Sequence, residues 1–531
     1  METNCIYLPY QQTGSFSTIV TDYLAQDEKL KPFYTHAPTL EGIKAAIEDR
    51  RSYITDRQLL VDQLRAQYAS IDLSALQQQY LDELLLDNTF TICTAHQPNI
   101  FTGHLYFIYK ILHAIKLADE LRQQLPAYNF VPVYYMGSED ADLDELGHIT
   151  IDGKNYKWNT AQTGAVGRMK VDKAFISLIS EMEGQLLIHP YGQELVDLFK
   201  RSYTLGSSIQ QCTLELVNAL FASYGLLVLI PDNAALKQPF NQVVKRELLE
   251  QFSYPLVQQT CEALSQHYKV QAGGRPINLF YLIEDKRERI EKAGEEYVVV
   301  NLQKNWKEAE LLQEVDEHPE RFSANVILRG VFQEMILPNI AFIGGGGELA
   351  YWMELKEVFN ACAVPFPVLV LRNSFMMVNE QQLQASGKLG FEIDELFAST
   401  DQLVHTLIKK HNGVKLSLEE EIDAIETVYD KVAVASSTID GTLKEHVEAL
   451  RTRHLKHLNE LEKKMLRAEK RKYAAEQRQV QKLRDQLFPK NGLQERVDNF
   501  SLFYANFGKN WIEKLYKVSL ALDQKFAILK L

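Results

Sequence analysis

Two β-rich runs enclose a polar loop and a helical stretch, and this order constrains the fold more than any other feature of the chain. The first run is Phe90–Thr94 and the second is Phe130–Met136. The apolar positions between the runs are Leu105, Ile108, Leu112, Ile115 and Leu121. Their spacing of three and four residues is typical of a helix. The unit therefore predicts strand, loop, helix and strand.

Two further pieces of the chain repeat this order. The helical stretch Ser207–Ser223 leads into the apolar run Leu226–Ile230, and Glu348–Cys362 leads into Val364–Leu371. Alternating helices and strands predict an α/β fold with a parallel sheet, in which ligands bind beyond the carboxyl ends of the strands. The loops that should form such a site begin at Ala95, Gly137, Pro231 and Arg372.

A chain of 531 residues is too long for one core and suggests about three units. The segments between the core pieces are longer than ordinary connections, so we interpret them as insertions. We predict a parallel-sheet core in 1–149, 206–232 and 323–400, inserted connecting subdomains in 150–205 and 233–322, a helical coiled-coil domain in 401–490, and a C-terminal segment that packs on the core in 491–531.

The segment Leu416–Leu487 is rich in Glu, Lys, Arg, Leu and Gln and contains no proline. It carries a stripe with helical spacing at Leu443, Val447, Leu450, His454, Leu461 and Ala468. This pattern predicts a long helix or a helical hairpin. Two interpretations remain open, a helical pair packed within one chain and a coiled coil that forms a dimer.

Composition and charge exclude several classes of protein. The net charge of -13 argues against a dominant nucleic-acid-binding surface, although it is compatible with a local basic groove. No apolar run is long enough to span a bilayer, and the first residues lack the pattern of a secretory signal, so we expect a cytoplasmic protein without a membrane segment. The five cysteines show no CxxC spacing and predict free thiols rather than a disulfide framework or a zinc site.

Parallel strands end at the same edge of a sheet, so the loops after the first two strands should meet. The side chains brought together there would be His96, Gln97, Asn99, Glu139, Asp140, Asp142 and Asp144. Imidazole, amide and carboxylate groups can orient an amine, act as a general base or hold Mg²⁺. The alternatives are a solvated acidic turn and a loop histidine that makes ordinary hydrogen bonds.

Three other patterns have both a functional and a structural interpretation. Tyr106, Lys110 and His113 share one helix face, which we interpret as a surface face although Lys110 could contact an anion. Gly344–Gly347 before a helix could bring backbone amides to a ligand, or could be a turn that needs positive φ. Arg372 could hold a carboxylate, or could form a structural ion pair.

Six motifs, in order along the chain, resemble the family of bacillithiol biosynthesis cysteine-adding enzymes. TAHQPNIFTGHLYFIYKI is similar to the family's TGQQxGLxTGPLYTxxK, and VPVYYMGSEDADLDELGH is similar to VPVFWxxxEDHDFxEINH. The others are NLFYL, SANVILRGVFQEMILPNIAFIGGGGELAYW, PFPVLVLRNS and GLQERVDN. The sequence departs from the family pattern at His96, His104, Ala141 and Gly347.

The resemblance, together with the predicted cleft, supplies the candidate site residues. We assign catalysis to His96, Glu139, Asp140 and Asp142, and no metal ligand. We assign substrate binding to Gln97, Asn99, Thr102, Gly103, Asn278, Arg329, Gln333, Glu348, Tyr351, Arg372 and Ser374. In this hypothesis Arg372 pairs with a substrate carboxylate, and Glu139 or Asp140 accepts the proton of an amine.

The resemblance also implies a Rossmann-like core with connecting subdomains and a coiled coil that makes a homodimer. The implied activity is addition of cysteine to the amine of glucosaminyl-malate, an amide-forming ligase reaction that uses ATP or ADP, with Mg²⁺ as an option. Two alternatives are a nucleotide-binding coiled-coil scaffold without catalysis and a nucleotidyltransferase that acts on another small molecule.

Overall fold

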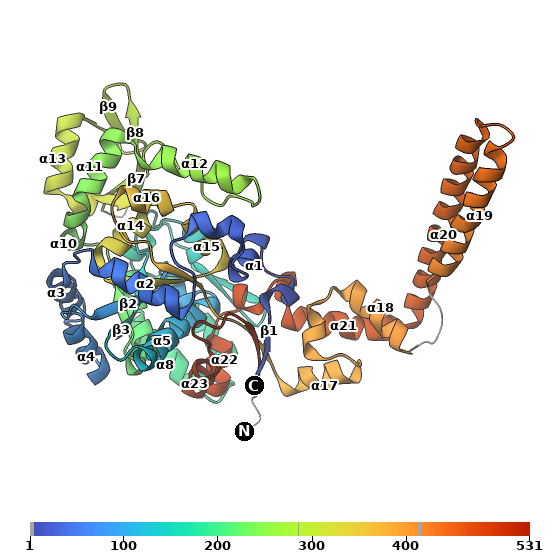
Figure 1. The fold of residues 1–531 in the computed structure, drawn as a ribbon. Coiled ribbons are helices and arrows are strands. Elements are labelled where there is room, and N and C mark those ends of the chain that lie inside the picture. The colour runs from blue at the N-terminus through green and yellow to red at the C-terminus, as the bar shows by residue number, and fades with distance from the viewer. Residues whose placement is uncertain (1–4, 285, 412–416) are drawn as a thin grey trace. The chain divides into compact units, whose positions relative to one another are not determined.

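The computed structural model describes residues 5–284, 286–411 and 417–531 and divides into two compact units (Figure 1). The first unit comprises Met1–Met376 and Gly492–Leu529, and the second comprises Met377–Asn491 and Lys530–Leu531. The core segment predicted to extend to residue 400 therefore crosses the boundary between the units. None of the described helices is both long enough and apolar enough to span a bilayer.

A five-stranded parallel sheet forms the centre of the first unit, which confirms the predicted α/β class. Its strands, in spatial order, are β13 (Val368–Leu371), β12 (Asn339–Gly344), β2 (Thr89–His96), β3 (Asn129–Met136) and β6 (Leu227–Leu229). All neighbouring pairs run parallel, with His96 opposite Met136 at the ends of β2 and β3. The carboxyl ends of the strands therefore lie at one edge.

Strand β12 was missed by the sequence pattern, although it lies between β13 and β2. All six of its residues are buried, like nearly all of those in the neighbouring strands. Its apolar run Ile340–Ile343 is only four residues long, however, and so short a run is as compatible with a buried helix as with a strand. Strand β13 begins at Val368, later than expected. Pro365 and Pro367 precede it, and proline lacks the amide hydrogen that a strand ladder needs.

Helices cover both faces of this sheet. On one face, α2 (Leu40–Arg51) and α5 (Tyr106–Gln124) share a hydrophobic cluster with β2, β12 and β13. On the other face, α15 (Gly346–Met353) places Trp352 against Phe342 of β12, with ring centroids 4.3 Å apart. Helix α15 ends before α16 (Lys356–Ala361), so the single helix expected there is two.

The inserted segments form their own elements. The first contains the antiparallel pair β4 (His148–Ile151) and β5 (Lys154–Lys157), followed by α7 (Lys173–Leu186) and α8 (Gly192–Ser202). The second contains α10 (Ala234–Lys237), α11 (Asn241–Glu250), α12 (Ser253–Ser265), β7 (Leu279–Ile283), β8 (Lys286–Ala293), β9 (Glu296–Val299), β10 (Lys304–Lys307) and α13 (Glu308–Glu317). Strand β11 (Phe322–Ala324) completes a sheet of order β10-β9-β8-β7-β11.

Shorter elements complete the first unit. Its other helices are α1 (Thr18–Leu24), α3 (Arg57–Gln67), α4 (Ala75–Glu83), α6 (Leu143–Leu146), α9 (Ile209–Phe221), α14 (Val326–Ile336), α22 (Ser501–Phe507) and α23 (Lys509–Val518). A separate sheet has the order β1 (Cys5–Leu8), β15 (Phe526–Lys530) and β14 (Ser374–Val378).

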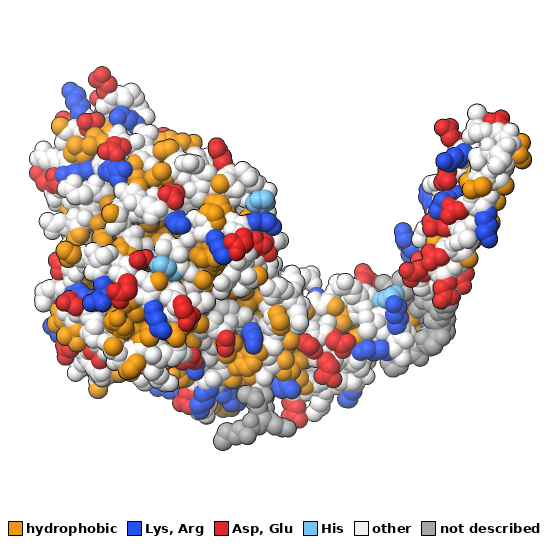
Figure 2. All heavy atoms as spheres, viewed as in Figure 1, with side chains coloured by type: hydrophobic (Ala, Val, Ile, Leu, Met, Phe, Trp, Pro, Cys, Tyr) orange, Lys and Arg blue, Asp and Glu red, His pale blue; other side chains and the backbone are white. Residues whose placement is uncertain are grey.

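The second unit is helical. It contains α17 (Glu380–Lys388), α18 (Thr400–His411), α19 (Glu419–Ser437), α20 (Leu443–Lys472) and α21 (Ala474–Leu487). Helices α19 and α20 form the predicted hairpin, in which Arg451 bonds Asp430 at 3.0 Å. Charged side chains cover much of its visible face (Figure 2). Leu416, the predicted start of this segment, lies outside the described residues.

Candidate active site

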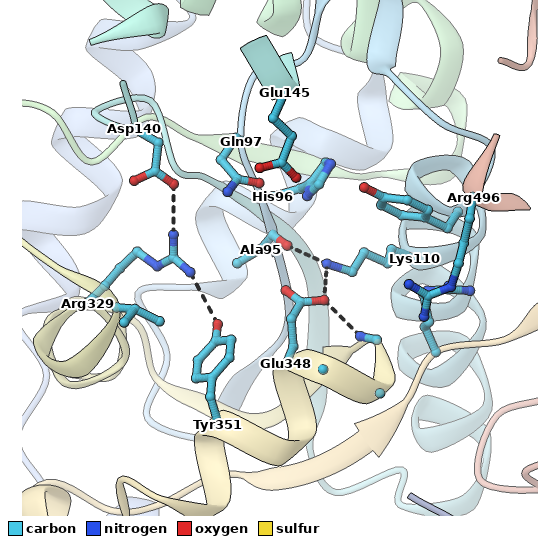
Figure 3. Close-up of a pocket in the computed structure, with 16 residues that line it drawn as sticks. Ala95, His96, Gln97, Lys110, Asp140, Glu145, Arg329, Glu348, Tyr351 and Arg496 are labelled. Atoms are coloured by element: carbon cyan, nitrogen blue, oxygen red, sulfur yellow. Dashed lines mark hydrogen bonds and ion pairs between the residues drawn. The ribbon is translucent and has the colours of Figure 1, made fainter. Parts of the chain in front are cut away.

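A pocket of about 360 Å³ opens at the carboxyl ends of β2, β3, β12 and β13 (Figure 3). Each of these strands is followed by a loop or a helix whose residues line the pocket. The lining residues are Ala95, His96, Gln97, Tyr106, Lys110, Asp140, Glu145, Val326, Arg329, Gly345, Gly346, Gly347, Glu348, Tyr351, Arg372 and Arg496. All belong to the first unit.

A lysine from α5 and a glutamate from α15 form one part of the wall. The ammonium of Lys110 donates to the Ala95 carbonyl at 2.8 Å and lies 2.5 Å from Glu348 Oε2. The same carboxylate accepts the Gly345 amide at 2.8 Å and so caps α15. Lys110 and His113 are buried, so the prediction of a surface face on α5 is wrong. The helix crosses the core, and Lys110 is buried with its charge paired.

A second ion pair connects the loop after β3 with α14. Arg329 Nη1 lies 3.2 Å from Asp140 Oδ2, and its Nη2 donates to the Tyr351 hydroxyl at 3.2 Å. Arg287 approaches the other oxygen of Asp140 at 3.7 Å. Two guanidinium groups therefore lie against Asp140, one at each of its carboxylate oxygens.

A third ion pair closes the pocket behind β13. Arg372 Nη2 donates to Glu495 Oε1 at 2.7 Å, and its Nη1 donates to Ser374 Oγ at 3.1 Å. Both charged side chains are almost fully buried. The guanidinium also lies over the Tyr106 ring, 5.1 Å from the centroid. Glu495 and Ser374 therefore occupy the guanidinium group of Arg372, which agrees with a structural ion pair.

His96 follows β2 and contributes a neutral imidazole. Burial lowers its pKa well below the usual value, and the positive charge of Lys110 lowers the pKa further. Its Nε2 is buried and has no hydrogen-bond partner among the described residues. The ring packs near Tyr106 and Phe107, at centroid distances of 5.3 and 5.6 Å. His96 can therefore offer a hydrogen bond to a ligand without adding charge.

Glu145 and Arg496 complete the charged lining. Glu145 lies on the short helix α6, and burial raises its carboxyl pKa, with further contributions from Asp142 and Asp140. In the view of Figure 3, Glu145 points toward Gln97 and His96. Neither Glu145 nor Arg496 forms an ion pair within the described ranges, unlike the other charged lining residues.

Glycines at the start of α15 bring backbone into the pocket. Gly345, Gly346 and Gly347 line it, and none of the three has positive φ. The turn interpretation of this run therefore does not apply. A Cβ on Gly346 would lie 2.9 Å from Val20 Cγ2, so close packing requires glycine there. Across the described parts of the chain, no three His, Cys, Asp or Glu side chains are placed to hold a metal ion.

Comparison with known proteins decides the family. The description "Bacillithiol biosynthesis BshC, N-terminal Rossmann-like domain" matches residues 1–373, and "Bacillithiol biosynthesis BshC, C-terminal coiled-coil domain" matches residues 375–531. The chain belongs to the BshC family.

Similar proteins of the BshC family carry the name "Putative cysteine ligase BshC". Those from Flavobacterium johnsoniae and Flavobacterium psychrophilum are each 38% identical to this chain over 100% of both sequences. The relative from Cytophaga hutchinsonii is 37% identical over 96% of this chain and 95% of its own. The similarity therefore spans both units.

About half of the site residues predicted from the sequence line this pocket. Those that line the pocket are His96, Gln97, Asp140, Arg329, Glu348, Tyr351 and Arg372. Those outside its lining are Asn99, Thr102, Gly103, Glu139, Asp142, Asn278, Gln333 and Ser374.

Glu139 and Asp142 have other partners. Glu139 forms an ion pair with Lys237 and accepts the Ser323 hydroxyl at 3.0 Å, which turns it toward the second inserted segment. Asp142 Oδ1 accepts the Glu145 amide at 3.2 Å and caps α6. Both residues shape the loop after β3 instead of lining the pocket.

Two other candidates are held in buried hydrogen bonds. Asn278 donates its backbone amide to Glu247 at 2.9 Å and its side chain to Ser253 at 2.7 Å. Gln333 donates to Glu334 Oε1 at 2.9 Å. These contacts satisfy polar groups that would otherwise be buried without partners.

Asn99, Thr102 and Gly103 lie in the loop after β2, and the conformation of this loop keeps them out of the pocket lining. Phe101, Thr102 and Gly103 all have positive φ, and Asn499 donates to the carbonyls of Phe101 and Gly103. A Cβ on Gly103 would lie 2.8 Å from Asn99, so the BshC sequence needs glycine there. The loop carries Gln97 to the pocket and buries Asn99 and Thr102.

Sequence reasoning assigned no site role to four lining residues that carry polar groups, which are Tyr106, Lys110, Glu145 and Arg496. Two of them carried a signal: Glu145 matches a glutamate of the family's VPVFWxxxEDHDFxEINH motif, and Lys110 was considered as an anion contact. Helix α5 is apolar on nearly every side, which is the pattern of a fully buried helix, and this signal could have placed Lys110 in the core. Arg496 lies in the BshC-like motif GLQERVDN, but its position in the pocket depends on contacts with residues far away in the sequence, which the motif alone does not predict.

Proposed function

We propose that this protein joins cysteine to the amine of glucosaminyl-malate and thereby forms an amide bond. One observation carries the proposal. All lining residues of the pocket belong to five of the six motifs that resemble the cysteine-adding family, although these motifs are spread over the chain from Thr94 to Asn499. The names of the relatives, which refer to a cysteine ligase, support the same reaction.

The pocket has the chemistry that such substrates need. It combines guanidinium groups, a carboxylate without an ion-pair partner and a neutral imidazole, and it lies where parallel sheets bind ligands. A carboxylate substrate can bind to guanidinium, and an amine can bind to a carboxylate. A volume of about 360 Å³ suits one small molecule and excludes a macromolecule.

We propose that the reaction uses an adenine nucleotide, with or without Mg²⁺. A free carboxylate does not react readily with an amine, so cysteine would first become an acyl phosphate or an acyl adenylate. The amides of Gly346 and Gly347 at the start of α15, and the guanidinium of Arg496, which has no ion-pair partner in the described ranges, suit an anionic group. If ATP or ADP binds, either should raise the melting temperature by mass action. No shift at millimolar concentration would remove nucleotide from the proposal.

We further propose a homodimer through the α19–α20 hairpin and a cytoplasmic location. Apolar side chains on this hairpin remain exposed at Val428, Val432, Val434, Ile439, Leu443 and Leu461. Exposed apolar groups on paired helices favour a partner helix. Light scattering at micromolar concentration tests the dimer, and a monomeric mass for the intact chain would contradict it.

The decisive experiment is incubation of the purified protein with glucosaminyl-malate, cysteine and ATP, followed by mass spectrometry. The expected product has the combined mass of both substrates less one water. Nucleotide binding without any product would favour a scaffold. Pyrophosphate release that does not need cysteine would favour a nucleotidyltransferase.

A further inference from the structure

The charges around the pocket are almost completely paired. Lys110 pairs with Glu348, Arg329 with Asp140, and Arg372 with Glu495, at N–O distances of 2.5, 3.2 and 2.7 Å. These pairs account for all but two of the charged lining residues.

The two that remain are Glu145 and Arg496, which have opposite charges. Neither has an ion-pair partner among the residues that the structure describes. In the view of Figure 3, they point into the pocket from different elements, Glu145 from α6 and Arg496 from the segment before α22. A ligand that carries both an ammonium and a carboxylate could therefore satisfy both without breaking an existing pair.

We propose that Glu145 binds the ammonium of the acceptor substrate and accepts its proton, while Arg496 binds a carboxylate of the same molecule. The inference rests on the proposed function, because glucosaminyl-malate has one amine on its sugar and carboxylates on its malate. It assigns to Glu145 the part that sequence reasoning gave to Glu139 or Asp140.

The surroundings of the acidic residues decide between them. Asp140 lies against Arg329 and Arg287, at 3.2 and 3.7 Å, and Glu348 lies against Lys110 and the Gly345 amide. Both carboxylates are therefore already occupied by cations or amide donors and are less available to the ammonium of a substrate. Among the described residues no ion pair holds the carboxylate of Glu145, and the nearby His148 lowers its pKa less than the other groups raise it. Partial burial raises its pKa, with help from Asp142 and Asp140, which favours proton acceptance.

Glu145 and Arg496 both act electrostatically on the hydroxyl of Tyr106, which lines the same pocket. Burial is the main cause that raises the pKa of Tyr106 to about 12, and the negative charge of Glu348 adds to it. Glu145 raises this pKa and Arg496 lowers it. Glu145 and Arg496 thus have opposite effects on the pKa of the same phenol.

The step balances with the activated cysteine proposed above. The ammonium first gives one proton to Glu145, and the resulting amine attacks the cysteinyl carbonyl carbon. A C–N bond forms, the C–O bond to phosphate breaks, and the phosphate or AMP leaves with the electron pair. The nitrogen then loses its second proton. Glu145 is exposed enough to pass protons to solvent between these events.

Titration calorimetry on the full-length protein tests this recognition without relying on turnover. Three probes are needed: glucosaminyl-malate, glucosyl-malate, which lacks the amine, and methyl glucosaminide, which lacks the carboxylates. Glu145→Gln should weaken glucosaminyl-malate binding about tenfold to a hundredfold, the range for a charged hydrogen bond. It should change glucosyl-malate binding by less than about twofold, since that probe has no ammonium.

Arg496→Gln should show the mirror pattern. It should weaken both malate probes and leave methyl glucosaminide unchanged. Matched controls are Asp144→Asn, which lies on α6 outside the pocket lining, and Arg201→Gln on α8, both exposed. Neither control should alter the affinity for any probe.

Two results overturn the inference: equal losses for probes with and without the amine in Glu145→Gln, or no binding of glucosaminyl-malate to the unsubstituted protein. The proposed function fails separately. The predicted binding pattern without an amide product would refute the reaction and leave the recognition intact. For the proton transfer, Glu145→Gln should also remove the acidic limb of the kcat/KM profile, which a purely structural role would not do.

Discussion

The charged residues on the inner wall of the pocket are buried and paired, whereas those on its rim are exposed and have no ion-pair partner among the described residues. On the wall, Lys110 and Arg372 are buried and each has a carboxylate at 2.7 Å or less. On the rim, Glu145 and Arg496 are exposed and have no ion-pair partner in the described ranges. Both regions belong to one pocket, yet a substitution should affect them in different ways.

The difference separates stability from recognition. A buried charge that loses its partner destabilises the fold strongly, whereas an exposed charge without a partner contributes little to folding. The wall therefore fixes the shape of the pocket, and the rim is free to bind a substrate. Substitutions on the wall should lower the free energy of unfolding, and those on the rim should lower substrate affinity.

The largest effect should come from Glu495→Ala. It removes the carboxylate that accepts from Arg372 at 2.7 Å and from Ser374 at 3.2 Å, and it leaves a buried guanidinium without its counter-charge. We expect a loss of about 3–5 kcal/mol in the free energy of unfolding, measured by urea denaturation. The matched control is Asp82→Ala, which breaks an exposed pair with Arg65 and should cost less than about 1 kcal/mol. Equal losses in the two variants would contradict the distinction.

The next effect is a dependence of stability on pH at His113, which lies behind the wall. Burial lowers its pKa from 6.5 to about 4, and Nδ1 accepts the Asn373 amide at 3.0 Å. Between these values the unfolded state binds a proton that the folded state does not, so stability falls as pH falls below 6.5. We expect a loss of about 2 kcal/mol by pH 5.

Denaturation at pH 7 and pH 5 measures this loss. His113→Gln should show a smaller difference between the two pH values, and His457→Gln, an exposed histidine on α20, should behave like the unsubstituted protein. An unchanged pH dependence in His113→Gln would show that other groups cause it.

Asp140→Asn should have a mixed effect, because Asp140 is partly exposed and lies between two arginines. We expect a loss of about 1 kcal/mol in stability. Turnover should fall further than this cost explains, since Arg329 loses the charge that holds it beside Tyr351. Thermal unfolding and steady-state kinetics on the same preparation measure both. Normal turnover would exclude a positioning role for Asp140.

The smallest effect on stability should come from the rim. Glu145→Gln and Arg496→Gln should each change the free energy of unfolding by less than about 0.5 kcal/mol, because neither side chain forms an ion pair with another described residue. Urea denaturation beside the binding titrations checks this. A loss comparable to that of Glu495→Ala would mean that the rim is structural.

Local pattern was sufficient for much of the fold. Strands β2 and β3 could be predicted from their β-rich runs, and helix α5 from the spacing of its apolar residues. The alternation of helices and strands predicted the parallel sheet. Strand β12 did not follow, because its apolar run Ile340–Ile343 has only four residues and so short a run is compatible with a helix as well as with a strand. The α19–α20 hairpin was predicted, but the choice between pairing within one chain and pairing between chains does not follow from a helical stripe.

The site was harder to predict because its electrostatics depend on distant contacts. Arg372 meets Glu495, more than a hundred residues away, and Lys110 meets Glu348. Without these distances, Arg372 suggested a substrate-binding fork and Asp140 suggested a base. Which charge remains unpaired is a property of the folded structure, so the family pattern could mark Glu145 as a candidate, but only the structure sets Glu145 and Arg496 apart from the paired charges.

The most direct test compares amide formation by the unsubstituted protein, Glu145→Gln and Asp144→Asn under identical conditions. Each is incubated with glucosaminyl-malate, cysteine and ATP, and the product is quantified by mass spectrometry. We expect a cysteinyl amide from the unsubstituted protein and from Asp144→Asn, and at least tenfold less from Glu145→Gln. No amide from any of the three, or equal amounts from all three, would contradict this expectation.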